Sequence, residues 1–140
     1  MTKSAFYLLS FTWGLPTTLA GCIAAAGLRL TGHKPKKWGW CWYFEYGGDH
    51  WGGMSLGIFF MKDRSNSIHI KNHEHGHAVQ NCYFGPLMPF LIAAPSFTRY
   101  WYREYLKRVR HVQPKTPYDA VWFEAQATRL GTEFVNKING

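Results

Sequence analysis

The sequence predicts an α+β fold in one domain that covers residues 1–140. Three observations predict this class. An uncharged, apolar stretch from Ala5 to Leu28 has the length of a membrane-crossing helix. Aromatic residues alternate along residues 38–46, and after a turn at 47–49 a second strand is indicated over 54–61. Two further segments, 67–83 and 118–138, have the spacing of helices. One hydrophobic core fits a chain of this length, and two do not.

The apolar stretch 5–28 is predicted to be a transmembrane helix that Pro16 would kink. A secretory signal is an alternative, and Leu19-Ala20-Gly21-Cys22 also matches a lipoprotein cleavage box. An anchor is favoured because a long apolar run is followed at once by four basic residues, Arg29, Lys34, Lys36 and Lys37. By the positive-inside rule these residues lie in the cytoplasm. We therefore expect a protein of a bacterial inner membrane with its site on the cytoplasmic side.

The overall composition also favours a membrane partner. The chain has 16 Lys and Arg against 8 Asp and Glu, a net charge of +8, which suits an anionic neighbour. Aromatic residues make up 18% of the chain, as is typical of a membrane interface, and no nucleic-acid motif is present. We expect a lipid bilayer as partner and no nucleic acid. The three cysteines form no C-x-x-C pair, which argues against a disulfide framework and a cysteine zinc site.

Residues 38–46 are predicted to form a strand with one aromatic face, made of Trp38, Trp40, Trp42, Phe44 and Tyr46. Such a face suits the headgroup region or a core beneath a helix. Gly47-Gly48-Asp49 indicates a turn, and residues 54–61 indicate a second strand. We expect the two strands to pair as an antiparallel hairpin.

Ser67 is predicted to cap a helix that runs to about Tyr83. The apolar segment 84–97 follows; it is short for a membrane span and has basic residues on both sides. We expect it to be re-entrant or to lie in the membrane interface. The mean hydropathy of −0.26 also argues against several spans. Residues 111–117 form a link, and a final helix is predicted over 118–138.

The helix after Ser67 contains His73-Glu74-His75-Gly76-His77, which includes the pattern His-Glu-x-x-His. Residues four apart share one helix face, so His73 and His77 can offer two imidazoles to one Zn²⁺ ion. Glu74 lies beside them, where a carboxylate can take a proton from a zinc-activated water. The pattern predicts a zinc hydrolase site with Glu74 as the general base.

Catalytic zinc needs a third protein ligand, and no histidine or carboxylate follows at the spacing of the extended motif. The downstream candidates are Glu104, His111, Asp119, Glu124 and Glu133. Glu124 is preferred because it shares a helix face with the small residues Ala120, Ala127 and Gly131, which would allow close packing against Gly76. The alternative is that Glu124 is a solvated helical glutamate.

The motif and the helix around Glu124 together resemble the gluzincins, zinc metalloproteases whose third ligand is a glutamate in an E-x-x-A helix, as in CAAX prenyl proteases. A closer similarity is to small zincin-like membrane proteins whose motif also occurs at the ends of RHS-repeat toxins. The matching segments are Leu15-Pro16-Thr17-Thr18, Gly52-Gly53-Met54-Ser55-Leu56-Gly57, His73 to His77, Gly85-Pro86-Leu87, Pro95-Ser96 and Glu124 to Gly131. His75 and Thr128 depart from the pattern, which has Tyr at the first position and often Asp at the second.

The resemblance implies a minimal zincin-like domain: an N-terminal transmembrane helix, a small antiparallel sheet, the motif helix and a C-terminal helix with the third ligand. It implies a membrane-bound zinc metalloprotease that cleaves peptides or membrane-proximal proteins, with His73, His77 and Glu124 as zinc ligands. A strand around Ser55 would pair with an extended substrate, although an ordinary hairpin strand is equally expected.

The remaining histidines leave other interpretations open. His69 and His75 are expected at a surface or interface rather than on the metal, because they lie off the ligand-bearing face. His111, Tyr100, Tyr102 or Tyr118 could stabilise a tetrahedral intermediate, and the sequence does not choose among them. One alternative function is a metal buffer or sensor that uses His69, His73, His75 and His77. Another is a degenerate zincin that serves as an interaction module.

Overall fold

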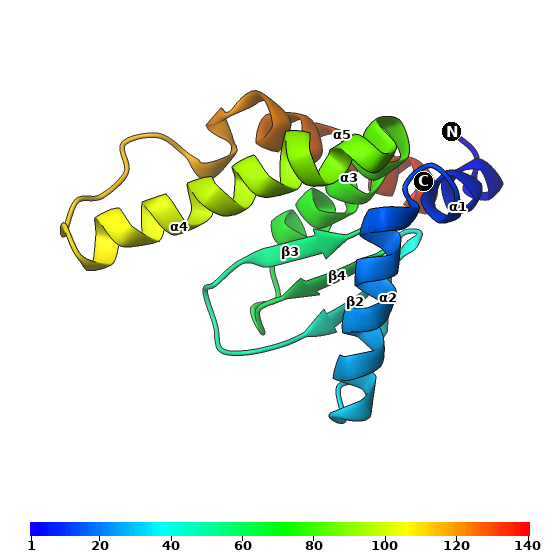
Figure 1. The fold of residues 1–140 in the computed structure, drawn as a ribbon, viewed down its shortest axis with the longest axis horizontal. Coiled ribbons are helices and arrows are strands. Elements are labelled where there is room, and N and C mark those ends of the chain that lie inside the picture. The colour runs from blue at the N-terminus through cyan, green and yellow to red at the C-terminus, as the bar shows by residue number, and fades with distance from the viewer.

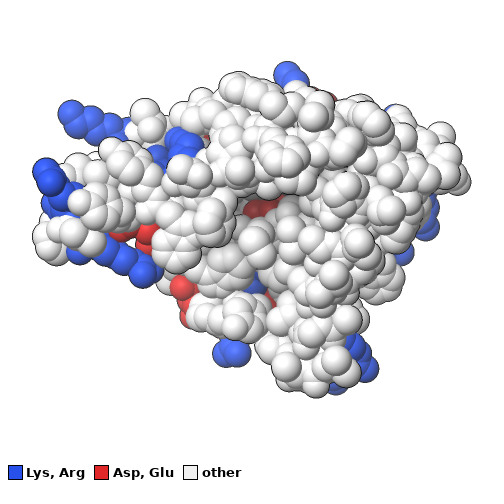
Figure 2. Space-filling view, viewed as in Figure 1, with Lys and Arg blue, Asp and Glu red and all other residues white.

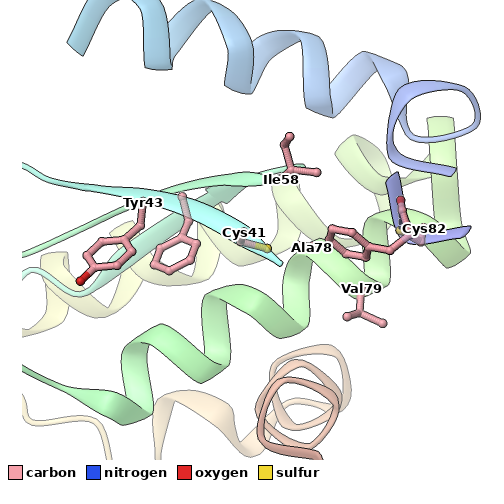
Figure 3. Close-up of a cluster of buried hydrophobic side chains, with 8 residues drawn as sticks. Cys41, Tyr43, Ile58, Ala78, Val79 and Cys82 are labelled. Carbon is pink, nitrogen blue, oxygen red and sulfur yellow. Dashed lines mark hydrogen bonds between the residues drawn. The ribbon is translucent and has the colours of Figure 1, made fainter. Parts of the chain in front are cut away.

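The computed structural model describes residues 1–140 and shows a mixed α+β fold of five α-helices and a four-stranded sheet. The sheet lies between helix α2 on one face and helix α3 on the other, and α5 packs on the far side of α3 (Figures 1 and 3). The elements in chain order are α1 (Lys3–Phe11), α2 (Leu15–Leu30), β1 (Lys36–Trp38), β2 (Cys41–Glu45), β3 (Gly53–Leu56), β4 (Phe59–Lys62), α3 (Ile68–Phe84), η1 (Gly85–Leu87), η2 (Pro89–Ala93), α4 (Ala94–Arg108), η3 (Tyr118–Ala120) and α5 (Trp122–Asn139).

The prediction of one continuous apolar helix over 5–28 is wrong. The chain breaks between α1 and α2, which are bent by 89° relative to each other. Pro16 lies in the first turn of α2, where its missing N–H costs nothing, so it begins a helix instead of kinking one. No single helix is long and apolar enough to cross a bilayer. The bent pair of α1 and α2 has the required length and apolar composition only when the two helices are taken together.

The sheet differs from the predicted hairpin because each predicted strand is itself a hairpin. The first segment turns at Gly39 and the second at Gly57, both with positive φ (58° and 68°), as short hairpin loops require. The strand order is β1-β2-β4-β3, in which β2 pairs with β4 in parallel. The sheet is therefore mixed, and the prediction of an antiparallel sheet is wrong. The predicted aromatic face is interrupted as well: Phe44 is buried and Trp42 is exposed.

The main hydrophobic core lies between the sheet and α3, and α1 closes one end (Figure 3). Its eight buried residues are Phe6, Cys41, Tyr43, Ile58, Phe60, Ala78, Val79 and Cys82. The ring of Tyr43 stacks on that of Phe60, with centroids 5.2 Å apart. This core attaches one face of α3 firmly to the sheet, so that its opposite face is available to α5.

Helix α3 begins as predicted, since the Ser67 side chain accepts a hydrogen bond from the backbone N–H of Ile70 at 3.2 Å. It ends at Gly85, which has a positive φ of 54°. The apolar segment 84–97 then continues as a 3₁₀ turn (η1) and a π-helical turn (η2), and its last residues begin α4. At the C-terminal end, a 3₁₀ turn over 118–120 precedes α5, so the final helix starts four residues later than predicted.

Candidate metal centre

Three side chains from two helices converge at one point. The Nε2 atoms of His73 and His77 lie 3.1 Å apart, and Glu124 Oε2 lies 3.0 Å from the first and 3.2 Å from the second. All three residues are buried, Glu124 completely. The structure thus brings together the three residues that the sequence predicts as metal ligands, and no other group of histidines, cysteines and carboxylates has the geometry to hold an ion.

Glycines on both helices allow this convergence. A Cβ atom placed on Gly76 of α3 would lie 1.8 Å from the carbonyl oxygen of Ala127. A Cβ atom on Gly131 of α5 would lie 1.6 Å from the carbonyl oxygen of Asn72. Neither contact is sterically allowed, so α3 and α5 approach this closely only because both residues lack a side chain. Of the small residues predicted to share the Glu124 face, Ala127 and Gly131 are buried and pack against α3, whereas Ala120 is exposed and lies in η3, before the helix begins.

The far nitrogen of each imidazole has a hydrogen-bond partner. His77 Nδ1 lies 2.7 Å from Gln80 Oε1, which can only accept, so His77 carries its proton on Nδ1. The amide nitrogen of Gln80 is held in turn by the Phe123 carbonyl and by Gln126, each at 2.8 Å. His73 Nδ1 lies 2.8 Å from Thr128 Oγ1. These hydrogen bonds orient both imidazole rings so that Nε2 faces the centre.

On the His73 side, the hydroxyl of Thr128 donates to Asp119 Oδ2 at 3.4 Å, so its oxygen accepts from His73 Nδ1–H. Thr128 therefore connects the His73 imidazole to the Asp119 carboxylate. Asp119 was a candidate third ligand in the sequence, and the structure places it behind a ligand instead.

This donor set fits Zn²⁺. With both Nδ1 atoms hydrogen-bonded on the far side, two Nε2 atoms and a carboxylate oxygen face one another at one point, where they can bind a cation. Zinc–nitrogen bonds of about 2.0–2.1 Å in a tetrahedron place ligand atoms about 3.3 Å apart. The observed separations of 3.0–3.2 Å are close to that value. Two histidines and one glutamate also leave a fourth position for water or substrate.

Glu74 is buried next to the cluster, and its Oε2 atom has no hydrogen-bond partner. Burial raises the pKa of its carboxyl group, although His77 and His73 oppose this effect. A Cβ atom on Gly53 of β3 would lie 2.7 Å from Glu74 Oε1. The edge strand therefore passes directly beside the predicted general base, and a side chain at position 53 would require Glu74 to move.

The second oxygen of Glu124 accepts a short hydrogen bond from the Ser96 hydroxyl at the start of α4. Ser96 Oγ lies 3.1 Å from the phenolic oxygen of Tyr118. Burial alone would raise the pKa of Glu124, but the hydrogen bonds from His73 and His77 outweigh it and hold that pKa well below its usual range. Glu124 is therefore a carboxylate, as a metal ligand must be.

Tyr118 closes the centre on the α4 side. Burial and the nearby Glu124 carboxylate raise its pKa to about 12, so it keeps its proton. The guanidinium groups of Arg99 and Arg103 lie over its ring at 5.1 and 5.7 Å. The same two arginines donate to backbone carbonyls of residues 116–118, which attaches that segment to α4.

A groove of about 1000 Å³ opens onto the centre. Its walls are β3 on one side and η2 and α4 on the other, and His73, Glu74 and His77 line its floor. Figure 2 shows this groove as a hollow between α4 and the edge of the sheet, with acidic side chains visible inside it. The candidate centre is therefore accessible to a ligand from one side.

The other candidate residues do not join the converging group, although the ring of His69 lies 6.3 Å from that of His73. His69 is exposed, as expected, and so are His111 and Glu133. Glu104 forms ion pairs with Lys107 and Arg108 along α4, at 3.7 and 3.0 Å. None of these residues belongs to the converging group.

The expectation that His75 lies at a surface or interface is wrong, because it is fully buried in the core. Its ring stacks on Phe6, with centroids 6.0 Å apart, and its Nε2 accepts from the Trp40 backbone N–H at 3.2 Å. Burial lowers its pKa to about 4, so the ring is neutral. As expected, it does not join the cluster.

Three residues that the sequence did not predict in this role support the centre. Gln80 lies one helical turn after His77, and that spacing could have identified it as the partner of Nδ1. Ser96 was noted only as part of the Pro-Ser match, and Thr128 only as a departure from the related pattern. Their contacts with Glu124 and His73 join residues 28 and 55 positions apart, so no local signal predicts them.

Comparison of the chain with models of protein families, with curated proteins and with solved structures finds no match.

Proposed function

We propose that this chain is a zinc-dependent peptide hydrolase of the gluzincin type that works at a membrane surface. One observation carries the proposal: the lone pairs of His73, His77 and Glu124 converge beside an unpartnered carboxylate oxygen of Glu74. A site that only stores metal needs the ligands but has no use for a free buried base at that position. The arrangement therefore favours hydrolysis over storage.

Each residue has a defined role in this proposal. Bound zinc would act as a Lewis acid that polarises the scissile carbonyl and lowers the pKa of a water ligand. Glu74 accepts the proton of the attacking water and transfers it to the leaving amine. Gln80 and Thr128 fix the tautomers and orientations of the two imidazoles. Ser96 orients the Glu124 carboxylate through its second oxygen.

Tyr118 can donate a hydrogen bond to a developing oxyanion, since its phenol keeps its proton and its ring lies 6.5 Å from that of His73. Of the residues that the sequence left open for this role, Tyr100 also lines the groove, whereas Tyr102 and His111 do not. Tyr118 is our first choice because its hydroxyl is already linked to Glu124 through Ser96.

Strand β3 would hold the substrate. It is the last strand in the sheet order, so only one of its edges is paired, and it lies along the groove beside Glu74. An extended peptide can add to such an edge through backbone hydrogen bonds. This arrangement would bring the peptide backbone next to the metal centre.

Membrane attachment is part of the proposal. Large apolar side chains are exposed on the outer face of α1 and α2 and at the turn between them: Leu8, Phe11, Trp13, Leu19, Ile23 and Leu30. Apolar groups exposed in such numbers favour contact with a bilayer. Arg29 and the lysines after α2 suit anionic headgroups on the cytoplasmic side of a bacterial inner membrane.

The first test is metal content. Protein purified without chelators should contain about one zinc per chain, and Glu124→Ala should lose most of it. Glu133→Ala is the matched control, because Glu133 is an exposed glutamate on the same helix. Equal zinc in the wild type and Glu124→Ala would contradict the ligand assignment. A wild-type protein that binds no metal would favour the interaction-module alternative.

The second test is hydrolysis of a peptide library in the presence of vesicles. Glu74→Gln keeps the size of the side chain but removes the base, so it should keep zinc and lose cleavage by a factor of at least about 10². Glu133→Gln should cleave like the wild type. If Glu74→Gln cleaves as fast as the wild type, the hydrolase proposal fails and a metal buffer or sensor takes its place.

A further inference from the structure

The groove changes character along its length. Near the metal centre its α4 wall carries the apolar side chains Phe97 and Trp101, which are 61% and 52% exposed and pack edge to face. Met54 lies opposite on β3 and is also exposed. Large apolar side chains exposed inside a groove gain free energy when a ligand covers them. This part of the groove therefore suits a bulky apolar residue.

The far end of the α4 wall is cationic. Arg103, Lys107 and Arg108 line the groove there, together with a single acidic residue, Glu104. Lys107 and Arg108 share the Glu104 carboxylate, and Arg103 donates to the Thr116 carbonyl rather than to an acid. Three cations against one carboxylate leave two positive charges in excess. Figure 2 shows basic side chains clustered at this end of the molecule.

We propose that the groove selects extended peptides with a bulky apolar residue near the cleaved bond and a carboxylate farther along on the C-terminal side. This inference rests on the proposed function, because it concerns the substrate of the same centre. The two wall regions lie on one side of the groove, so one extended peptide can meet both at once.

The spacing follows from helix and strand geometry. Ser96 marks the level of the metal centre on α4, since its hydroxyl contacts Glu124. Arg103 and Lys107 lie seven and eleven residues farther along, which is about 10 and 16 Å at 1.5 Å per residue. An extended peptide covers about 3.3 Å per residue. The carboxylate is therefore expected about three to five residues from the cleaved bond.

The direction follows from the orientation of α4 and β3. They run alongside each other in opposite directions, so the cationic end of α4 lies toward the start of β3 (Figure 1). Antiparallel strand pairs are slightly more stable than parallel ones. A peptide that adds antiparallel to β3 has its C-terminal part toward the start of that strand, and so toward the cations.

The experiment uses full-length Glu74→Gln protein, so that binding is measured without cleavage. The main probes are amidated peptides with one bulky apolar residue and, four residues farther toward the C-terminus, Glu, Gln or Lys. A further probe carries the Glu on the N-terminal side of the apolar residue. A last probe has a free C-terminal carboxylate in place of the Glu side chain. We expect the C-terminal Glu peptide to bind at least about fivefold more tightly than the Lys peptide at low salt, with the difference shrinking at 0.5 M salt. A free carboxylate that binds as well as the Glu peptide would identify the chain terminus as the natural anion.

Lys107→Glu in the Glu74→Gln background should abolish or reverse this preference. Lys137→Glu is the matched control, because it makes the same charge change on an exposed residue outside the groove. Equal binding of the Glu and Lys peptides, or a stronger effect of the N-terminal Glu, would overturn the inference. Peptide cleavage by the wild type is measured separately. If the wild type cleaves peptides but shows no preference for the Glu peptide over the Lys peptide, only this inference is refuted. If the protein prefers the Glu peptide but the wild type cleaves none of the peptides, the hydrolase function is refuted.

Discussion

Replacing Gly131 by alanine tests whether helix contact sets the metal centre. The new Cβ atom would lie 1.6 Å from the carbonyl oxygen of Asn72 and 2.9 Å from the backbone nitrogen of Gly76. Carbon and oxygen atoms approach each other without strain only to about 3.3 Å. The two helices must therefore separate locally by about 1.7 Å. Both neighbours are backbone atoms, so no side-chain rotation can relieve the contact.

The consequence for the site follows from the position of Glu124 on the same helix, two turns before Gly131. Metal–ligand distances tolerate only about 0.2 Å of variation. A displacement several times larger, even when a tilt of α5 reduces it, moves the carboxylate away from the two Nε2 atoms. We expect zinc affinity to fall by at least about 100-fold and overpacking to destabilise the fold by about 1–3 kcal/mol.

The assay is competition for zinc with a chromophoric chelator, together with thermal unfolding with and without zinc. Circular dichroism identifies the folded fraction to which the affinity refers. Gly27→Ala is the matched control, because it lies in α2 with open space around it and should be neutral or stabilising by up to about 1 kcal/mol. Wild-type zinc affinity in folded Gly131→Ala protein would refute the reasoning that the close α3–α5 contact positions Glu124.

Three further predictions follow from the same geometry. Gly53→Ala should displace Glu74 and lower the rate of peptide hydrolysis by a factor of about 10², while zinc content stays unchanged. Gly48→Ala, which has open space at its Cβ position, should change neither the rate nor the zinc content. A Gly53→Ala protein that hydrolyses peptides as fast as the wild type would contradict the placement of the base. Thr128→Val removes the hydroxyl that accepts from His73 and should weaken zinc binding by about 10–100-fold in chelator competition, and unaltered affinity would exclude a supporting role. Removing zinc with a chelator should lower the free energy of unfolding by about 3 kcal/mol, if free zinc was present before at 100 times its Kd. Adding zinc back should restore the melting temperature. A melting temperature that does not change on zinc removal would argue against a metal bound by the folded state.

Much of the centre was predictable from the sequence because its strongest signals are local. His73 and His77 share a helix face by their spacing, and Ser67 indicates where that helix begins. The choice of Glu124 among five candidates depended on the small residues of its own helix. Ala127 and Gly131 do pack against α3, whereas Ala120 lies outside α5. Gly76 and Gly131 lack the side chains that would separate the two helices.

The sheet was only partly predictable for a physical reason. Side chains alternate between the two faces of a sheet in parallel and antiparallel strands alike, so residues 38–46 and 54–61 indicated strands without indicating how they pair. The turns at Gly39 and Gly57 depend on what surrounds them. A Cβ atom on Gly39 would lie 2.8 Å from the ring of His75, and one on Gly57 would lie 2.4 Å from the hydroxyl of Thr18. Both contacts come from helices distant in sequence.

The sequence by itself indicated the candidate ligands, the adjacent Glu74 and the two helices that carry them, because helical periodicity is visible within a few turns. Only the tertiary structure decided which side chains hydrogen-bond to the candidate ligands. Thr128 contacts the His73 ring although the two residues lie 55 positions apart in the sequence, and Ser96 donates a hydrogen bond to Glu124, 28 positions away. The break between α1 and α2 is likewise a tertiary feature, since the Asn81 side chain of α3 donates to the carbonyl of Gly14 at 3.2 Å. Contacts of this kind depend on the folded arrangement of all the elements, which no local pattern contains.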